Sequence, residues 1–363
     1  MSDSDELGNI LYKYLIQERR NRMKKVIVFT DIHFGSSGDS EIHNQNCLDF
    51  IKFMTDYNKE HLDYQADIIF CGDWFNNRKQ TNNKTLDMAN EGLKLLSNAT
   101  AGKKYILVGN HDLYYSNSRD ITPVTKLDGL DYMIISKPTN VAIGSSKVLL
   151  CPWLVEEEKL PDLIKQNQPE YVFGHFELPS FWLNRLVQKD GELEWNDYRS
   201  CKRIVSGHYH MRQEKNNILY VGSCFSYNFS DENDWMNKGF AVLDLDDNTA
   251  EFVEWKDAPK FLKIDITDLP QIMPLLNDKI HLKIVNTTGS QPTELNQLLT
   301  LLKDNYNVSD AVIVSQQLQE VNQSVEKMEH IEDINVLVTS IISEMKFEHL
   351  STDRMIDIYN KLG

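Results

Sequence analysis

The sequence predicts an α/β fold whose core is a pair of mixed β-sheets, followed by a smaller α+β unit. Three observations lead to this prediction. Short β-rich runs recur along the first part of the chain, helical periodicity separates the early runs, and the pattern changes around Pro259. The 363 residues, 41% of them hydrophobic, are enough to bury a large core and smaller appendages.

The β-rich runs each end in a cluster of Gly, Asp or His, or in Pro-Trp. In chain order they read VIVFTDIH, ADIIFCGDWF, KYILVGNHD, VLLCPW, EYVFGHFE and RIVSGHYH. Short apolar runs of this kind are typical of buried strands that lead into polar loops. Residues 44–57 and 85–97 carry apolar residues at intervals of three and four, which predicts helices between the early strands.

The later runs, ILYVGS, GFAVLDL and AEFVEW, have no helical stretch between them, which predicts antiparallel pairing after the last histidine cluster. Beyond Pro259 the pattern is that of a small α+β unit. Residues 260–266, 279–285 and 311–315 are expected to form strands, and residues 293–303 a helix.

The tail of the chain shows two amphipathic helical patterns, INVLVTSIISEM and STDRMIDIYNKL. Such helices pack on their own domain or dock onto a partner, and their position after a polar stretch favours docking. The predicted organisation is an N-terminal extension (1–22), a core domain (23–259), a small α+β domain (260–315), a linker (316–330) and a helical segment (331–363).

The net charge of −16 argues against a protein that holds nucleic acid on a broad basic surface. Bound divalent cations reverse the local field, however, so an acidic chain can attract phosphate at a metal site. The five cysteines are scattered without CxxC spacing and are predicted to be buried, reduced thiols. With no apolar run of membrane-spanning length and no secretory signal, the protein is expected to be cytoplasmic.

Residues that can bind metal follow five of the strand-like runs. They are Asp31 and His33 in DIH, Asp73 in GDWF, Asn110, His111 and Asp112 in GNHD, His175 in GHFE, and His208 and His210 in GHYH. A single Asp or His after a strand is more often a turn or cap residue. Five such motifs in series favour a shared site, because sites in α/β proteins form at the carboxyl ends of strands.

Spacing and residue type both point to a catalytic metal site. Asp31 and His33 are two residues apart, as are His208 and His210, and side chains at this spacing point to the same side of an extended chain. Carboxylate, amide and imidazole donors suit manganese, with magnesium, iron or zinc as alternatives. The lack of nearby cysteine argues against a structural zinc site.

The series DxH, GD, GNHD, lone His and GHxH resembles the calcineurin-like metallophosphoesterases. That resemblance implies a four-layer α/β/β/α sandwich and two divalent ions, which polarise a phosphodiester oxygen and acidify a water molecule. It also implies site roles by position: Asp31, His33 and His210 on one ion, Asn110, His175 and His208 on the other, Asp73 bridging both, His111 facing the phosphate as a catalytic residue, and Asp112 orienting its imidazole.

Within this superfamily, GDWF, GNHDLYY, CPW and GHFEL are similar to the SbcD-type recombination nucleases, the phage-encoded ones in particular. GDWFNNR fits poorly with the GDxxDRG pattern of the protein phosphatases. The resemblance implies a DNA exonuclease or endonuclease of recombination and repair, with residues 260–315 as a cap. It further implies that residues 331–363 bind an SbcC-type coiled-coil ATPase, that a homodimer sits within a heterotetramer, and that double-stranded ends are cut in the host cytoplasm.

Two alternatives remain open from the residues. A small-molecule phosphodiesterase or phosphatase shares the core motifs but has no need for the cap and the terminal helices. A non-catalytic adaptor of an ATPase has no reason to keep buried carboxylates and imidazoles, which are costly to bury.

Several further residues lie just beyond the metal motifs and are candidates for gripping phosphates or stacking bases. They are Arg78, Lys79, Tyr114, Tyr115 and Tyr209. Positions in a solvated loop explain them equally well. Five histidines lie outside the motifs, and surface or capping positions are expected for them: His43, His61, His281, His330 and His349.

Overall fold

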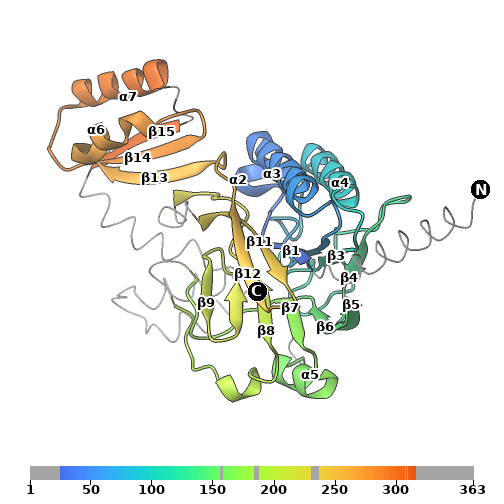
Figure 1. The fold of residues 1–363 in the computed structure, drawn as a ribbon. Helices are drawn as coiled ribbons and strands as arrows, with labels where there is room; N and C mark the ends of the chain where they lie inside the picture. Colours follow the sequence, from blue (N-terminus) through green and yellow to red (C-terminus); the bar gives the residue numbers. More distant parts are fainter. Residues whose placement is uncertain are drawn as a thin grey trace, which may run out of the picture.

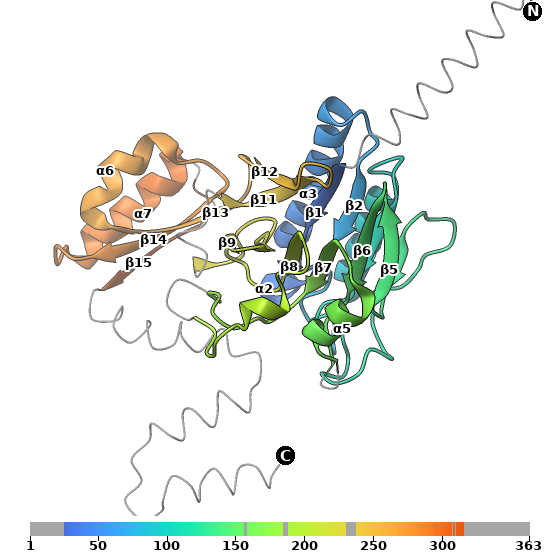
Figure 2. The same cartoon turned by 60° about the horizontal axis from the view of Figure 1, so that its bottom comes forward.

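The computed structural model describes residues 25–155, 158–183, 188–229, 237–306, 308 and 310–315. The predicted N-terminal extension (1–22), linker (316–330) and helical segment (331–363) lie outside the described residues. Two β-sheets lie face to face in Figures 1 and 2. Helices α3 and α4 cover the outer side of one sheet, and α5 lies on the outer side of the other.

The first sheet has six strands in the order β12-β11-β1-β2-β3-β4. Strands β1 to β4 are parallel, and the antiparallel pair β11 and β12 extends the sheet from β1. The central strand β1 reads KVIVF without polar interruption because both of its faces are covered. The strands are β1 (Lys25–Phe29), β2 (Asp67–Phe70), β3 (Lys104–Leu107), β4 (Met133–Ile135), β11 (Gly239–Asp244) and β12 (Thr249–Glu254).

The second sheet has six strands in the order β5-β6-β7-β8-β10-β9. Strands β6, β7, β8 and β10 are parallel, and β5 and β9 are antiparallel edge strands. The strands are β5 (Thr139–Ile143), β6 (Ser146–Cys151), β7 (Tyr171–His175), β8 (Arg203–Gly207), β9 (Gln213–Lys215) and β10 (Ile218–Tyr220).

The prediction of antiparallel pairing after the last histidine cluster is confirmed for β11 and β12, and for β10 it holds only for the pair with β9. Strand β10 runs parallel to β8, its neighbour in the sheet. The chain first runs back along the edge as the short strand β9 and then reverses again, which gives β10 the direction of β8. The three residues of β9 carry no apolar pattern, so nothing in the sequence indicates the extra reversal.

The predicted helices are present as α3 and α4, and both begin earlier than predicted. The side chains of Ser40 and Asn82 cap these helices by accepting hydrogen bonds from the backbone amides of His43 and Thr85. Helix α5 is only eight residues long, too short for its periodicity to stand out in the sequence. The helices of the sandwich are α2 (Ser36–Asp39), α3 (Glu41–His61), α4 (Asn83–Ser97) and α5 (Leu160–Asn167).

Alternating residues of the strands fill separate core layers. Ile27 and Phe29 pack with residues of α3 and α4, whereas Val26 and Val28 pack between the two sheets. On its outer face the second sheet packs against α5. The layers are therefore helix, sheet, sheet and helix, and the predicted four-layer sandwich is confirmed.

A third sheet, β13-β14-β15, is formed within residues 260–315, and its strands are all parallel. Helices α6 and α7 pack on it around a hydrophobic cluster that includes Leu282 and Leu302. Figure 1 shows this unit beside the sandwich, following β12. The predicted strands and helix are confirmed, while the role of a cap stays a prediction. The elements are β13 (Lys260–Asp265), α6 (Leu269–Ile272), β14 (Ile280–Asn286), α7 (Pro292–Tyr306) and β15 (Asp310–Ser315).

All five cysteines are buried and free, as predicted. Burial raises the pKa of Cys71 and Cys151, so both thiols are protonated at neutral pH. None of the described helices combines the length and the apolar character that a bilayer-spanning segment requires.

Candidate metal centre

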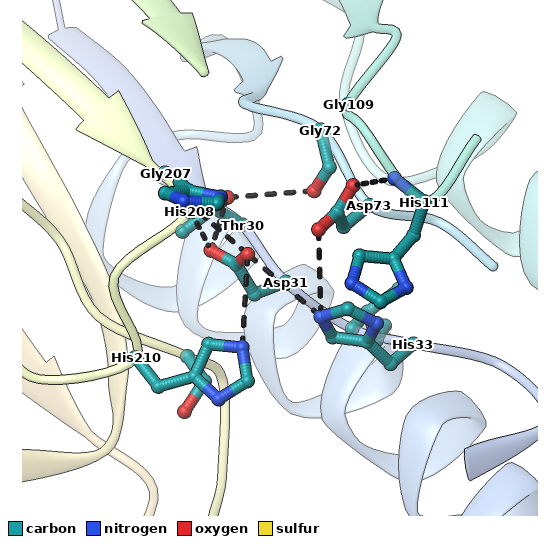
Figure 3. A network of polar contacts seen from close by, with 12 residues as sticks. Thr30, Asp31, His33, Gly72, Asp73, Gly109, His111, Gly207, His208 and His210 are labelled. Carbon is teal, nitrogen blue, oxygen red and sulfur yellow. Dashed lines mark hydrogen bonds and ion pairs between the residues drawn. The ribbon is translucent and has the colours of Figure 1, made fainter. Parts of the chain in front are cut away.

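The motif residues gather at one edge of the double sheet, at the end of strand β7 in the case of His175 and in the loops after β1, β2, β3 and β8 for the others. Strands β1, β2 and β3 of the first sheet are parallel, as are β7 and β8 of the second, so within each sheet the carboxyl ends share an edge. Figure 3 shows residues from these loops facing one another, with Asp31 and His33 from the first loop close to Asp73, His111, His208 and His210.

Backbone conformation in these loops is unusual. Four of the predicted ligands, Asp31, His33, Asp73 and His208, have positive φ angles of 51°, 51°, 65° and 88°. Non-glycine residues rarely adopt this left-handed region, and Asp and His tolerate it better than branched residues do. The sharp turns direct these side chains into the space between the loops instead of along the strands.

Glycines before the ligands allow the loops to approach closely. A Cβ atom at Gly109 would lie 2.1 Å from Oδ1 of Asp73, and one at Gly207 would lie 1.9 Å from Oγ1 of Thr30. Both distances are far below contact distance, so neither position accepts a side chain without moving the site. This close approach is the physical reason for glycine in the GNHD and GHYH motifs.

The first predicted ligand group is Asp31, His33 and His210. One donor atom from each residue lies within 4.8 Å of the others, close enough to share one cation. Nε2 of His33 and of His210 lie 3.8 and 4.0 Å from Oδ1 of Asp31. The Asp31 carboxylate is fixed from behind by the hydroxyl of Thr30 at 2.6 Å and by the backbone amide of His208 at 3.1 Å.

The second predicted group is Asn110, His175 and His208. Oδ1 of Asn110 lies 2.8 Å from Nε2 of His175 and 3.2 Å from Nδ1 of His208. The two imidazole nitrogens and the amide oxygen are therefore close to one another. The imidazoles of His175 and His208 pack edge to face with ring centroids 5.3 Å apart.

Asp73 lies between the two groups. Its Oδ2 is 3.6 Å from Nε2 of His33 and 3.3 Å from Nε2 of His175, while its Oδ1 accepts a hydrogen bond from the backbone amide of His111. One carboxylate oxygen thus faces a histidine from each group, which is the position a bridging ligand requires. The metal coordination itself stays a prediction.

The donor set fits divalent cations. Both ring nitrogens of His33 are buried and have no hydrogen-bond partner within the described part of the chain, which is costly for an imidazole unless a cation binds it. Nδ1 of His175 lies 2.7 Å from the carbonyl oxygen of Cys71 and must donate to it. Its Nε2 therefore presents a lone pair to the oxygens of Asp73 and Asn110, an arrangement that needs a proton or a metal ion there.

The electrostatics favour positive charge at this place. Burial alone would raise the pKa of Asp73, but the charges of His175 and His111 outweigh it and hold the pKa well below its usual range. In the same way His33, His175 and His210 lower the pKa of Asp31 against the effect of burial. Burial lowers the pKa of His175, yet Asp73 and Asp31 raise it to about 9. Two buried carboxylates thus stabilise whatever cation lies among them, a proton or a metal ion.

His111 is held next to this centre. Its Nδ1 donates to the carbonyl oxygen of Asn76 at 2.6 Å, which leaves Nε2 as the nitrogen that exchanges a proton. Its ring packs edge to face on His33 with centroids 4.9 Å apart. The ring is therefore fixed in orientation, with Nε2 as the nitrogen directed to gain or lose a proton, as general acid–base catalysis requires.

The predicted role of Asp112 needs correction. Its carboxylate accepts hydrogen bonds from the backbone amides of Asp73, Trp74, Phe75 and Gly109, at 2.9 to 3.2 Å. Burial and the charge of Asp73 raise the pKa of Asp112 to about 6 although these amides lower it. Asp112 thus joins the GDWF and GNHD loops, and the carbonyl of Asn76, not Asp112, orients the His111 ring.

The structure also shows supporting residues that sequence reasoning missed. His43, expected at a surface or capping position, is buried, and its Nε2 donates to the carbonyl oxygen of His33 at 2.9 Å. The thiols of Cys47 and Cys224 donate to the carbonyls of Ile32 and Thr30, on either side of Asp31. All three act on the backbone of the first loop, and backbone contacts of this kind leave no motif in a sequence.

The five candidates for DNA contact differ in position. Tyr209 is buried, and its hydroxyl donates to the carbonyl oxygen of Leu178, so it cannot stack on a base as predicted. Tyr114 and Tyr115 are exposed and lie edge to face beyond His111, with ring centroids 4.8 Å apart. Lys79 is exposed and Arg78 is half-buried, both beyond the GDWF loop. These four remain candidates for DNA contact.

Solved structures with similar folds are remote. A protein of unknown function from Aquifex aeolicus is 18% identical, with a TM-score of 0.25, over 60% of this chain and 95% of its own. GAP50, the anchor in the inner membrane complex of Plasmodium, is 12% identical, with a TM-score of 0.33, over 74% of this chain and 98% of its own. At these TM-scores neither likeness supports an argument.

Sequence comparison is more informative. Exonuclease subunit 1 of Enterobacteria phage T4 is 30% identical over 233 residues, which make up 63% of this chain and 67% of the relative. The predicted resemblance to a phage nuclease subunit is thereby confirmed. A family model described as calcineurin-like phosphoesterase matches residues 24–212, the segment that carries all five motifs. This protein therefore belongs to the calcineurin-like phosphoesterase family.

Proposed function

We propose that the protein is a metal-dependent DNA nuclease that hydrolyses phosphodiester bonds with two divalent ions, manganese foremost. The observation that carries the proposal is the position of Asp73, whose Oδ2 faces His33 of one donor group and His175 of the other. A pair of ions held there would supply Lewis-acid charge to the phosphoryl group and acidify a water molecule. The similarity to a phage exonuclease subunit supports DNA as the substrate.

The chain's own residues supply position and proton transfer. Thr30 and the amide of His208 fix the Asp31 carboxylate, and Asp112 fixes the two loops that carry Asp73 and Asn110. The Nε2 of His111 is then placed to donate a proton to the leaving oxygen or to stabilise charge on the phosphate. Each of these roles needs a rigid support, because small displacements of reacting groups reduce rates strongly.

Assembly forms the second part of the proposal. We infer that the nuclease works as a homodimer with an SbcC-type coiled-coil ATPase, bound through the predicted helices of residues 331–363, and acts on double-stranded ends. The phage T4 relative is named exonuclease subunit 1, a name that implies at least one further subunit there. Partner-stimulated cleavage of linear DNA by the full-length chain would support this assembly, and no stimulation would contradict it.

The decisive experiment measures cleavage of labelled linear DNA with manganese by the wild-type protein and by His111→Ala. We expect kcat to fall by roughly 10²- to 10⁴-fold, the range for loss of a general acid or base, while manganese still binds in calorimetric titration. His61→Ala is the matched control, because His61 is an exposed histidine at the end of α3 and should leave kcat unchanged. Equal rates for wild type and His111→Ala would rule out the assigned role.

Assaying a chromogenic phosphodiester beside the DNA substrate separates the alternative functions. Hydrolysis of a chromogenic phosphodiester without any cleavage of DNA would favour a small-molecule phosphodiesterase. Absence of both activities in a protein that still binds manganese would favour the adaptor.

A further inference from the structure

A pocket of about 360 Å³ opens directly beside the metal centre, on the outer side of the second sheet. Its walls include Trp153, Leu178 and Tyr198, and its polar groups come from Lys159, His175 and Glu177. Its volume is within the range of about 300 to 1,000 Å³ that small-ligand sites occupy. None of the roles described so far uses this pocket.

His175 connects the pocket to the metal centre. It is one of the predicted ligands, with Nε2 at 2.8 Å from Oδ1 of Asn110, and it also lines the pocket. The Trp153 ring lies against the same group, with centroids 5.1 Å from the His208 ring and 5.9 Å from the His175 ring. The pocket and the metal centre therefore share His175 and adjoin at the Trp153 ring.

Trp153 is held in place by its backbone. Its amide donates to the carbonyl oxygen of Val108 at 2.7 Å, and its carbonyl accepts from Nη1 of Arg119 at 2.8 Å. Arg119 is itself fixed by Glu158 at 2.6 Å. The backbone of Trp153 is thus fixed on both sides of its Cα, so the attachment point of the ring is set before a flat ligand packs against it.

One polar group of the pocket, the Glu177 carboxylate, favours a base over a second phosphate. Glu177 forms an ion pair with Lys189 at 2.9 Å, and its other oxygen is 3.9 Å from Nε2 of His208. A carboxylate at this place repels phosphate but accepts hydrogen bonds from ring N–H or amino groups. With an aromatic wall and aliphatic neighbours, it suits a flat heteroaromatic group.

We infer that this pocket binds the nucleobase of the nucleotide adjacent to the scissile phosphate, with Trp153 as the stacking wall. The inference rests on the proposed nuclease function and names the part of the substrate that the site recognises. The aromatic face is sequence-tolerant because every base has a π-face. Binding of the base in the pocket draws the attached phosphate toward the donors around Asn110.

The test compares two phosphodiesters that differ only in the nucleoside, the p-nitrophenyl ester of thymidine 5′-monophosphate and methyl p-nitrophenyl phosphate, with the full-length protein and manganese. In Trp153→Ala we expect the ratio of kcat/KM for the thymidine ester to that for the methyl ester to fall about tenfold. Trp153→Phe keeps an aromatic face and should retain most of the wild-type ratio. Trp182→Ala removes an exposed tryptophan that does not line the pocket and should leave the ratio unchanged.

An unchanged ratio in Trp153→Ala, or an equal fall in Trp182→Ala, would overturn the inference while phosphodiester hydrolysis itself stands. Hydrolysis of neither ester by the wild type would count against the proposed function instead. The pocket is then tested by calorimetric titration with thymidine 5′-monophosphate and with 2-deoxyribose 5-phosphate. Tighter binding of the nucleotide that is lost in Trp153→Ala supports the inference, and equal affinities for the two ligands overturn it.

Discussion

The loops of the metal centre and the third sheet both lie at parallel strands, but they differ in backbone conformation and in what they bury. The first has four non-glycine residues at positive φ within its donor set. Among the described residues 260–315, no non-glycine residue has a positive φ. The first region also buries Asp31 and Asp73, whereas the core of the third sheet is apolar, with Leu282 and Leu302 at its centre.

The difference shows that, of these two regions, the metal centre is the one with strained backbone conformations. A non-glycine residue in the left-handed region costs about 1–3 kcal/mol and persists only where surrounding contacts hold it. At the metal centre those contacts are the four amides on Asp112 and the hydrogen bonds to Asp31. The third sheet needs no such support because regular strands and apolar packing stabilise it. We therefore expect substitutions at the metal centre to change activity, and substitutions in the third sheet to change stability without changing activity.

The largest effect is expected from Asp73→Asn. Loss of a group that supports one metal ligand typically lowers affinity or activity by roughly 10- to 100-fold, and Asp73 faces both donor groups, so we expect a loss of about a thousandfold or more in phosphodiester hydrolysis. Manganese stoichiometry, measured by calorimetric titration, should fall below that of the wild type. If this variant had the manganese stoichiometry and the hydrolysis rate of the wild type, Asp73 would not be a bridging ligand.

Leu282→Ala tests the other half of the comparison. Leu282 is fully buried in β14, the central strand of the third sheet, so its truncation should lower the free energy of unfolding by about 3 kcal/mol. Manganese affinity should remain unchanged, because no donor comes from this sheet. Urea denaturation and metal titration of the same preparation measure both quantities. A parallel loss of manganese affinity would show that the two regions are coupled.

A smaller loss of stability is expected for Asp112→Asn. The amide group places an N–H₂ donor where the carboxylate accepted backbone amides, so at least the hydrogen bond from Phe75 is lost, which costs about 2 kcal/mol. Activity should fall as well, because without the bond from Phe75 and without the carboxylate charge the GDWF loop that carries Asp73 is held less firmly. Asp265→Asn is the matched control: this carboxylate accepts from Thr267 and Thr287 at the exposed end of β13, and its loss should leave activity unchanged. Equal activity losses in the two variants would contradict the assigned role of Asp112.

The smallest effect is a pH dependence in the third sheet. Burial lowers the pKa of His281 below its ordinary value of 6.5, although Asp310 acts in the opposite direction. The unfolded chain therefore binds this proton more tightly, and the stability that the neutral imidazole contributes is present above pH 6.5 and lost as pH falls below it. In His281→Gln the drop in unfolding free energy between about pH 7.5 and 5.5 should be smaller than in wild type. Urea denaturation at both pH values measures this difference, and an unchanged drop would contradict the assignment.

Much of the fold could be predicted because it depends on local pattern. Buried strands such as β1 need unbroken apolar residues, and α4 needs apolar residues at helical spacing, so both leave a periodic signal. Edge strands and short elements leave none. Strand β9 and helix α5 were missed for this reason, and the parallel pairing of β10 with β8 was not predicted because it depends on the reversal at β9.

The sequence alone determined which residues are the candidate metal ligands. Asp31, His33, Asp73 and the later histidines are marked by residue type, by the preceding strand and by glycines that no larger residue can replace. Only the tertiary structure decided how they are supported: that Asn76 orients His111, that Asp112 joins two loops, that Tyr209 is buried, and that Trp153 forms a wall beside His208. Donor atoms are chosen by side-chain chemistry, which a sequence states directly, whereas these supports are contacts between distant segments and exist only once the two sheets have packed together.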